Sequence, residues 1–347
     1  MGDTDVEYDS ILLVSFGGPE NRADVMPFLE NVVRGKNVPP DRLKEVAAHY
    51  NHFEGKSPIN EQNRALIAAL EEELRKSEID LPIYWGNRNW NPFILEALRQ
   101  MRDDGKKRAL AFFTSAYSSY SGCRQYLQNI EEAREELGEG APVIDKLRAF
   151  YNHPGFIEAN VDALLAALET LPKERRECAR VAFTAHSIPD AMAETCDYAA
   201  QIEETARLVA DGARQERWQL VYQSRSGPPH VPWLGPDILE HLEALSQINV
   251  KDVVVSPIGF ISDHMEVIWD LDHEARDVAS ELGITLTRAP TVGTHPAFVA
   301  MIRELIEERL GKVTVRQALG KRGASPDVCP PDCCQYQPRV SRPPEPA

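Results

Sequence analysis

Residues 180–189 read RVAFTAHSIP. An apolar, β-branched and aromatic run ends at Ala185, a histidine and a serine follow it, and Pro189 turns the chain. A short run without alternating polar residues is typical of a strand that is buried on both faces, as the strands of parallel sheets are. We therefore predict a buried parallel strand here, with the imidazole of His186 at the carboxyl edge of its sheet.

Six further runs of this kind lie at residues 11–16, 83–86, 109–114, 219–223, 252–258 and 284–288. Amphipathic segments between them, such as 60–76 and 156–171, are predicted to be helices that cover the sheets. Because three runs precede residue 150 and four follow it, we predict an α/β fold of two Rossmann-like, doubly wound lobes with parallel sheets. The first lobe is expected to span residues 1–155, the second 156–312, and an irregular extension rich in proline and cysteine 313–347.

The composition indicates a folded protein without a polyanionic or membrane partner. Of its 347 residues, 43% are hydrophobic and 27% are charged, as in ordinary folded domains. Thirty-eight Lys and Arg against 54 Asp and Glu give a net charge of -16, which opposes binding to nucleic acid. No apolar run approaches the roughly 18 residues that span a bilayer, and the start of the chain is acidic where a secretory signal is basic. We expect a cytoplasmic protein with no nucleic-acid partner and no membrane anchor.

Several motifs that often accompany such lobes are absent from the sequence. Gly-x-Gly-x-x-Gly does not follow the first run, and the tripeptide at 55–57 has Tyr50 where a P-loop needs glycine. His-Glu-x-x-His and Gly-x-Ser-x-Gly do not occur either. The sequence therefore does not favour a dehydrogenase, an NTPase, a zinc protease or an α/β-hydrolase.

Two strand ends in the second predicted lobe carry groups suited to metals and protons. His186 follows one run, and His264 and Glu266 follow the run at 252–258. Neutral imidazole and carboxylate are ligands for divalent transition metals and are equally suitable proton acceptors. Because the carboxyl ends of parallel strands share one edge of a sheet, we expect these three side chains to form the centre of the site.

A helix is predicted to follow Glu266, with a row of carboxylates at spacings of three or four residues. The row consists of Asp263, Glu266, Asp270, Glu274 and Asp277. Like charges stacked this way raise each other's pKa or attract cations. We interpret the row as a path for metal or protons that begins at the site; a solvated acidic face is the alternative interpretation.

The cysteines are few and unevenly placed. Three of the six, Cys329, Cys333 and Cys334, fall within six residues near the end of the chain. This clustering suggests metal binding. Beyond Tyr336 the proline-rich tail has no apolar periodicity and is expected to be flexible.

Four segments of the sequence resemble those of ferrochelatases, which insert ferrous iron into a porphyrin. They are SFGGPE (15–20), FTAHSIP (183–189), QSRSGPPHVPWLGP (223–236) and PIGFISDHMEVIWDLDHE (257–274). The segments HFEGKSPINEQNR (52–64), WGNRNW (85–90) and TSAYSSYSGCRQY (114–126) more closely resemble the actinobacterial branch, which acts on coproporphyrin III. The resemblance implies the class II chelatase fold, with the macrocycle in a cleft between the lobes.

The resemblance also implies roles for individual residues. It makes His186 and Glu266 the catalytic pair and the ligands of the incoming Fe2+, with His264 beside them. The carboxylate row interpreted above as a metal or proton path then continues from Glu266 to Asp270 and Glu274. In the first lobe it implies that Ser57 and Tyr126 contact the porphyrin propionates. Phe16 belongs to the same substrate-binding wall and stands where firmicute members have a tyrosine, so one proposed axial ligand is missing.

Some members of the family hold a [2Fe-2S] cluster with one internal cysteine and three near the carboxyl end. The resemblance therefore implies a cluster on Cys123, Cys329, Cys333 and Cys334. Cys196 is the alternative fourth ligand. The spacing differs from that of animal members, so a zinc site, or no metal, is also open.

The expected reaction is insertion of Fe2+ into coproporphyrin III, with release of two protons, in haem biosynthesis. A lyase acting on protoporphyrin IX or on another tetrapyrrole is the second interpretation. A haem or porphyrin carrier without turnover is the non-enzymatic one. Transient contact with the downstream enzyme of haem synthesis is also expected.

Overall fold

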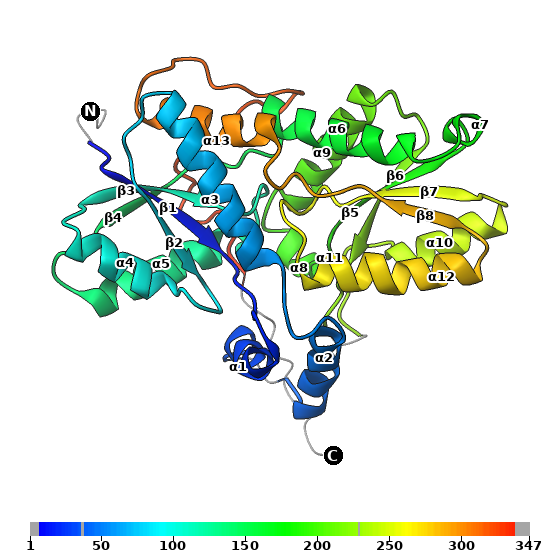
Figure 1. Cartoon of the computed structure of the whole chain (residues 1–347), viewed down its shortest axis with the longest axis horizontal. Coiled ribbons are helices and arrows are strands. Elements are labelled where there is room, and N and C mark those ends of the chain that lie inside the picture. Colours follow the sequence, from blue (N-terminus) through cyan, green and yellow to red (C-terminus); the bar gives the residue numbers. More distant parts are fainter. Residues whose placement is uncertain (1–6, 36–37, 228–229, 337–347) are drawn as a thin grey trace.

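A computed structural model of the chain describes residues 7–35, 38–227 and 230–336. It contains two parallel four-stranded sheets, with strand orders β2-β1-β3-β4 and β6-β5-β7-β8. The first sheet consists of β1 (Ser10–Ser15), β2 (Ile83–Asn87), β3 (Arg108–Phe113) and β4 (Val143–Lys146). The second consists of β5 (Arg180–His186), β6 (Trp218–Gln223), β7 (Asp252–Ser256) and β8 (Thr285–Arg288). Figure 1 shows the two sheets on opposite sides of the molecule.

Helices surround both sheets. Those of the first half are α1 (Arg22–Val32), α2 (Pro40–His52), α3 (Ile59–Lys76), α4 (Ile94–Asp103) and α5 (Gln125–Leu137), the last preceded by a π-helical turn, η1 (Tyr120–Arg124). Those of the second half are α6 (Pro154–Glu169), α7 (Lys173–Arg176), α8 (Asp190–Ala193), α9 (Tyr198–Gly212), α10 (Ile238–Gln247), α11 (Met265–Val267), η2 (Ile268–Ala275), α12 (Arg276–Glu281) and α13 (Pro296–Arg309). In Figure 1, α1 and α2 project below the two sheets.

All seven predicted strands are present, and one strand was missed. The missed strand, β4, is only four residues long and pairs with β3 at the edge of its sheet, where Ala109 is opposite Ile144. Its sequence, VIDK, has two apolar residues, too few to stand out as a buried run. The predicted parallel α/β architecture is confirmed.

One hydrophobic core extends under both sheets. The central strands β1 and β5 contribute side chains to it, including Ile11, Leu13, Val181 and Phe183, none of which is exposed. Helix α13 comes late in the chain but packs against both α3 and α6. The two sheets are thus joined by packing as well as by the chain, and the boundary between residues 155 and 156 stays a prediction.

The described part of the carboxyl-terminal extension contains no helix or strand but is fastened to the body. The backbone N–H of Leu319 donates to the carbonyl of Asn152 at 2.8 Å, and the Asn152 amide donates back to the carbonyls of Leu319 and Gly323. Arg322 pairs with Asp197 at 2.9 Å. The tail beyond Tyr336, predicted to be flexible, lies outside the described residues.

Within the described ranges, every helix is too short or too polar to cross a bilayer.

Candidate active site

The end of β5 and the loop after β7 are held together at their backbones. His186 is the last residue of β5, and the N–H of Gly259 donates to the carbonyl of Thr184 at 3.0 Å. A Cβ atom on Gly259 would lie 2.5 Å from the Cα of Ala185, closer than real Cβ contacts. Because only glycine permits this approach, the chain that carries His264 and Glu266 returns beside His186.

The three predicted catalytic side chains lie together. His186 Nε2 is 3.5 Å from Glu266 Oε2, and His264 Nδ1 is 3.9 Å from the same oxygen. The side chain of His186 is 31% exposed and that of Glu266 is 48% exposed. The site therefore joins a carboxylate to two imidazoles while leaving it open to a ligand.

The backbone contacts of the two histidines indicate which ring nitrogen is free in each. Nδ1 of His186 lies 2.5 Å from the carbonyl of Ser187, which can only accept, so this nitrogen carries hydrogen. Nδ1 of His264 accepts from the backbone N–H of Glu266 at 3.1 Å, so its hydrogen is on Nε2. His186 is therefore oriented to exchange a proton through Nε2, toward Glu266.

The two histidines differ in pKa. Burial lowers the pKa of His186, but the charge and hydrogen bond of Glu266 outweigh it and raise the value to about 9. For His264, burial lowers the pKa, and nearby His186 lowers it further. Near neutral pH the site therefore contains one imidazolium and one neutral imidazole, so the two rings have different roles.

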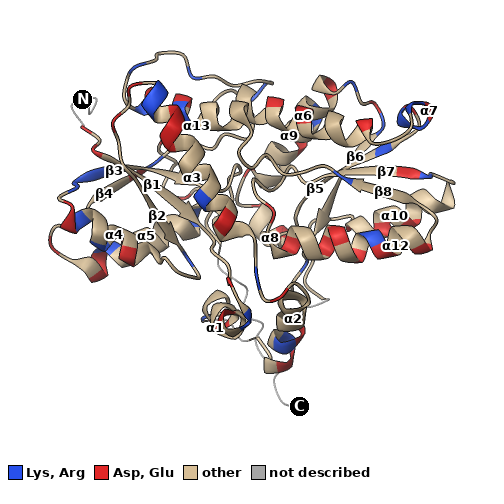
Figure 2. Cartoon of the chain, viewed as in Figure 1, with Lys and Arg blue, Asp and Glu red and all other residues tan. Residues whose placement is uncertain are grey.

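The helix after Glu266 is not the regular α-helix that we predicted. Residues Ile268–Ala275 form the π-helix η2, whose hydrogen bonds close one residue later than those of an α-helix. Each turn therefore holds more than four residues, and residues four apart lie nearly in line. Asp270 and Glu274 follow Glu266 of α11 at four-residue spacings, and Figure 2 shows acidic residues along this helix and α12.

The two outer members of the predicted row are engaged elsewhere. Asp263 accepts a hydrogen bond from Arg288 at 3.0 Å, and Asp277 pairs with His273 at 2.9 Å. The interpretation of the five carboxylates as a path for metal or protons stays a prediction. Arg288 belongs to β8 and was not part of the helical pattern, whereas His273 lies one turn before Asp277 in the same helical segment.

Asp270 is held by the end of β6. The hydroxyl of Ser224 donates to Asp270 Oδ2 at 2.5 Å, and the amide of Gln223 donates to the carbonyl of Glu266 at 3.0 Å. Burial raises the pKa of Asp270 to about 7, and the charges of Glu266 and Glu274 add to this effect. A carboxyl group with this pKa exchanges protons readily near neutral pH. We did not predict Gln223 and Ser224 as site residues, although they open the quoted 223–236 segment.

The predicted substrate-binding residues lie at the carboxyl edge of the first sheet. Phe16 follows β1, and its ring packs against Phe28 of α1 at 6.2 Å. Ser57 is 3% exposed and lies under the turn after β1, where a Cβ on Gly18 would be 2.8 Å from the Ser57 Cβ. Tyr126 is buried in α5, and burial raises its pKa.

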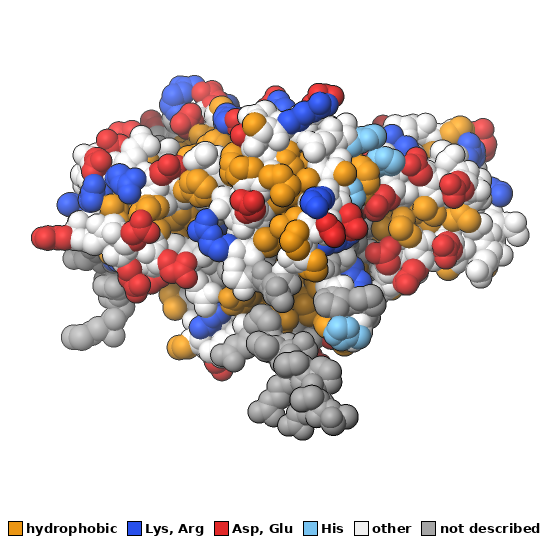
Figure 3. All heavy atoms as spheres, turned by 90° about the horizontal axis from the view of Figure 1, so that it is seen from below, with side chains coloured by type: hydrophobic (Ala, Val, Ile, Leu, Met, Phe, Trp, Pro, Cys, Tyr) orange, Lys and Arg blue, Asp and Glu red, His pale blue; other side chains and the backbone are white. Residues whose placement is uncertain are grey.

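An aromatic cluster joins α2 to the π-helix beside the acidic row. The rings of His49 and Trp269 are stacked at 3.9 Å, and His52 lies 4.9 Å from His273. Tyr50 packs under them, close enough for the charge of Glu266 to add to the burial that raises the Tyr50 pKa. Figure 3 shows the side of the molecule from which α1 and α2 project, with hydrophobic side chains gathered in its middle. Single aromatic residues in the sequence carried no signal that would have assembled this cluster.

Two of the four cysteines predicted to bind a cluster lie side by side. The sulfur atoms of Cys333 and Cys334 are 3.3 Å apart, and Cys334 is buried. Burial raises the Cys334 pKa, with further contributions from Cys333, Cys123 and Cys196. However, no three His, Cys, Asp or Glu side chains of the described residues form a group that could hold a metal ion. The predicted iron–sulfur site is therefore not supported by the arrangement of these side chains.

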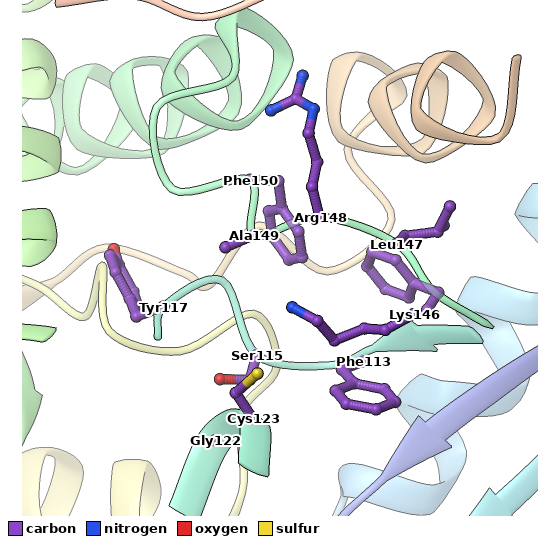
Figure 4. A pocket seen from close by; sticks show the side chains of 11 residues that line it. Phe113, Ser115, Tyr117, Gly122, Cys123, Lys146, Leu147, Arg148, Ala149 and Phe150 are labelled. Atoms are coloured by element: carbon purple, nitrogen blue, oxygen red, sulfur yellow. The ribbon is translucent and has the colours of Figure 1, made fainter. Parts of the chain in front are cut away.

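Two cavities flank these thiols. A cavity of about 10 Å3 is lined by Cys123, Ser115, Tyr117 and Lys146, and Figure 4 shows how these side chains surround it. A cavity of about 750 Å3 lies between the body and the extension, with Cys196, Cys329 and Cys333 in its wall. Lys146 lines both cavities. The internal cysteine favoured by the resemblance, Cys123, thus faces the smaller cavity, and the alternative, Cys196, faces the larger.

Known proteins with similar sequences indicate the family to which this chain belongs. The family model described as ferrochelatase matches residues 8–310. A ferrochelatase of Rhodopirellula baltica is 58% identical over 97% of this chain and 95% of its own length. A protein of Streptomyces coelicolor named coproporphyrin III ferrochelatase is 50% identical over 94% of this chain and 93% of its own length. A protein of Nocardia farcinica with the same name is also 50% identical, over 95% of this chain and 97% of its own length.

A solved structure supports the same fold. SirB from Bacillus subtilis with Fe3+ matches with a TM-score of 0.55 and 13% identity, covering 88% of this chain and 98% of that chain. At this identity the likeness concerns the fold alone. Together with the family match, it confirms the predicted class II chelatase fold. Because the family model covers most of the sequence and the relatives align over nearly all of it, this chain is a member of the ferrochelatase family.

Proposed function

We propose that this protein inserts Fe2+ into coproporphyrin III and releases two protons, as a lyase of haem biosynthesis. The observation that carries the proposal is the pairing of His186 Nε2 with Glu266 at 3.5 Å, at the head of the row formed by Glu266, Asp270 and Glu274. The names of the Streptomyces coelicolor and Nocardia farcinica relatives favour coproporphyrin III as the substrate.

The reaction needs a base and a route for protons. A free porphyrin carries two N–H groups where the metal must sit, so both protons have to leave as Fe2+ enters, and the exchange leaves the total charge unchanged. His186 takes a proton on Nε2, and Glu266 beside it stabilises the resulting imidazolium. Asp270, whose pKa is about 7, passes protons along the row toward Glu274. His264 contributes a neutral imidazole beside the same carboxylate.

The raised pKa of His186 couples proton release to metal entry. In the free site the negative charge of Glu266 keeps the proton on His186. A divalent cation that approaches Glu266 neutralises this charge and repels the imidazolium, so the His186 pKa falls. His186 then gives its proton to the carboxyl row and is free to accept one from the macrocycle.

The first lobe supplies the wall for the macrocycle in this proposal. The hydroxyls of Ser57 and Tyr126 serve as donors to propionate carboxylates. Phe16 offers an aromatic face to the ring, in keeping with its place in the aromatic cluster beside α1. The reaction is placed in the cytoplasm, and the product passes to the downstream enzyme through a transient contact.

An anaerobic assay tests the proposed activity. The purified protein is mixed with Fe2+ and either coproporphyrin III or protoporphyrin IX, and the visible spectrum is followed. We expect faster conversion of coproporphyrin III. Faster conversion of protoporphyrin IX would contradict coproporphyrin III as the substrate and make protoporphyrin IX the substrate instead. Tight binding of both without conversion, while a known ferrochelatase turns over in the same buffer, would identify a carrier.

We further infer that Cys123, Cys329, Cys333 and Cys334 hold a [2Fe-2S] cluster. Four thiolates are the donor set that such a cluster needs. The contact that supports the inference comes from Arg124, beside Cys123, which donates to the carbonyls of Pro331 at 2.7 Å and Cys333 at 2.8 Å. This fastens the cysteine-bearing turn to the helix that carries Cys123.

Metal analysis of cysteine variants tests this inference. Protein purified without oxygen is expected to contain iron and acid-labile sulfide in equal amounts, because both belong to the cluster. Cys123→Ser should lose both, and Cys196→Ser should retain them as the matched control. The reverse pattern would make Cys196 the fourth ligand. Zinc without sulfide, or no metal in the parent protein, would contradict the cluster.

A further inference from the structure

Arg88 carries a positive charge at the carboxyl edge of the first sheet. It directly follows β2, and its Nε donates to Asn129 Oδ1 at 2.8 Å. Its guanidinium carbon lies 4.8 Å from the centre of the Tyr126 ring and 5.9 Å from that of Phe16. Among the described residues, no Asp or Glu forms an ion pair with it within 4.0 Å.

Arg64 also lies over an aromatic ring, but unlike Arg88 it has a carboxylate partner within the described part of the chain. The guanidinium of Arg64 also lies over a ring, that of Trp85 at 5.4 Å, but it pairs with Glu20 at 2.5 Å. Arg88 is held in place by an amide and two rings, none of which neutralises its charge. A guanidinium fixed in this way can bind an incoming carboxylate at little cost in side-chain entropy.

The position of Arg88 points to an aromatic ligand. From Phe16, the ring of Phe28 is 6.2 Å away, and the ring of Tyr50 is 5.7 Å from that of Phe28. Phe28 and Tyr50 are buried, whereas Phe16 is only partly buried and lies beside Arg88. A flat apolar ring with acidic groups at its rim matches an aromatic side chain that lies beside a fixed cation, as Phe16 lies beside Arg88.

We propose that Arg88 binds a propionate carboxylate of the tetrapyrrole and thereby favours a substrate with four propionates over one with two. The inference rests on the proposed function and deepens it, since it assigns a residue to the choice of porphyrin. Besides their own contacts with the macrocycle, Tyr126 and Phe16 hold the guanidinium of Arg88 flat, and Asn129 fixes its Nε.

Porphyrin binding and turnover in Arg88→Gln and Arg88→Lys test the proposal. In Arg88→Gln the KM and Kd for coproporphyrin III should rise about 10- to 100-fold, the range for loss of a charge-assisted hydrogen bond. The KM for protoporphyrin IX, the KM for Fe2+ and the kcat should change less than about 3-fold. Arg88→Lys keeps the charge and should recover most of the affinity. Added salt should weaken coproporphyrin binding more in the parent than in Arg88→Gln, because a charge pair is screened.

Arg64→Gln is the matched control, because it removes a guanidinium that also lies over a ring but is already paired. It should leave both KM values unchanged. Equal effects of Arg64→Gln and Arg88→Gln, an unchanged Kd for coproporphyrin III, or equal loss for both porphyrins in Arg88→Gln would overturn the proposal. Fluorescence quenching measures the Kd without turnover, so a parent protein that binds porphyrin but inserts no iron would refute the proposed function while still testing Arg88.

Discussion

Replacing His186 by alanine is expected to lower the kcat of iron insertion by about 100- to 10,000-fold, the usual contribution of a positioned general base. His186 takes the pyrrole protons on Nε2 once it has passed its own proton to the carboxyl row, because its Nδ1 is engaged by the carbonyl of Ser187. The measurement is anaerobic turnover at saturating coproporphyrin III and Fe2+. Porphyrin affinity, measured separately by fluorescence, should change little, because the wall assigned to the macrocycle lies in the first lobe.

The control for this substitution is His295→Asn. His295 caps α13, where asparagine is also a good capping residue, and its ring pairs with Asp162 rather than with the site. It should turn over at the parental rate. A His186→Ala protein that retains a kcat within about 3-fold of the parent would refute the role of His186 as the base.

Replacing Glu266 by glutamine is expected to move the His186 pKa from about 9 in the parent to below its ordinary value of 6.5. Burial alone lowers this pKa, and Glu266 is the main group that raises it. The titration of the His186 ring, followed by NMR in protein without metal or porphyrin, measures the shift directly. Turnover should fall by about 100-fold or more in the same variant, because the base loses the carboxylate that stabilises its charged form.

The same substitution changes how folding stability depends on pH. A histidine whose pKa is raised in the folded state adds stability in full below its unfolded pKa, and this contribution is lost as the pH rises through the folded value. The melting temperature of the parent should therefore lose the His186 contribution between about pH 6.5 and pH 9, and Glu266→Gln should lack this loss. Glu274→Gln is the matched control. An unchanged His186 titration in Glu266→Gln would show that another group raises its pKa.

The structure also shows why the sequence did not reveal the π-helix after Glu266. Spacings of three and four residues are the same in any helical sequence, and they cannot distinguish an α-helix from a π-helix. The π-helix η2 contacts β8 and α2, through Arg288 with Asp272 and His49 with Trp269. These partners lie far away in the chain, so no local pattern contains them.

The sequence by itself determined the buried strands, the parallel α/β class and the placing of His186 and Glu266 at strand ends. Each of these depends on residues that are neighbours in the chain: an apolar run makes a buried strand, and the residues just after it lie at the carboxyl edge of a sheet. The short edge strand β4 and the Gln223 and Ser224 contacts to the π-helix carried too little local signal to be predicted.

Only the tertiary structure decided which charges are paired and which are left for a ligand. Asp263 and Arg288 neutralise each other across 25 residues, whereas Arg88 meets an amide and two aromatic rings. The pKa difference between His186 and His264 likewise depends on the 3.5 Å and 3.9 Å separations from one carboxylate. Charge pairing and pKa values follow from distance and burial, and these exist only once segments that are remote in sequence have packed together.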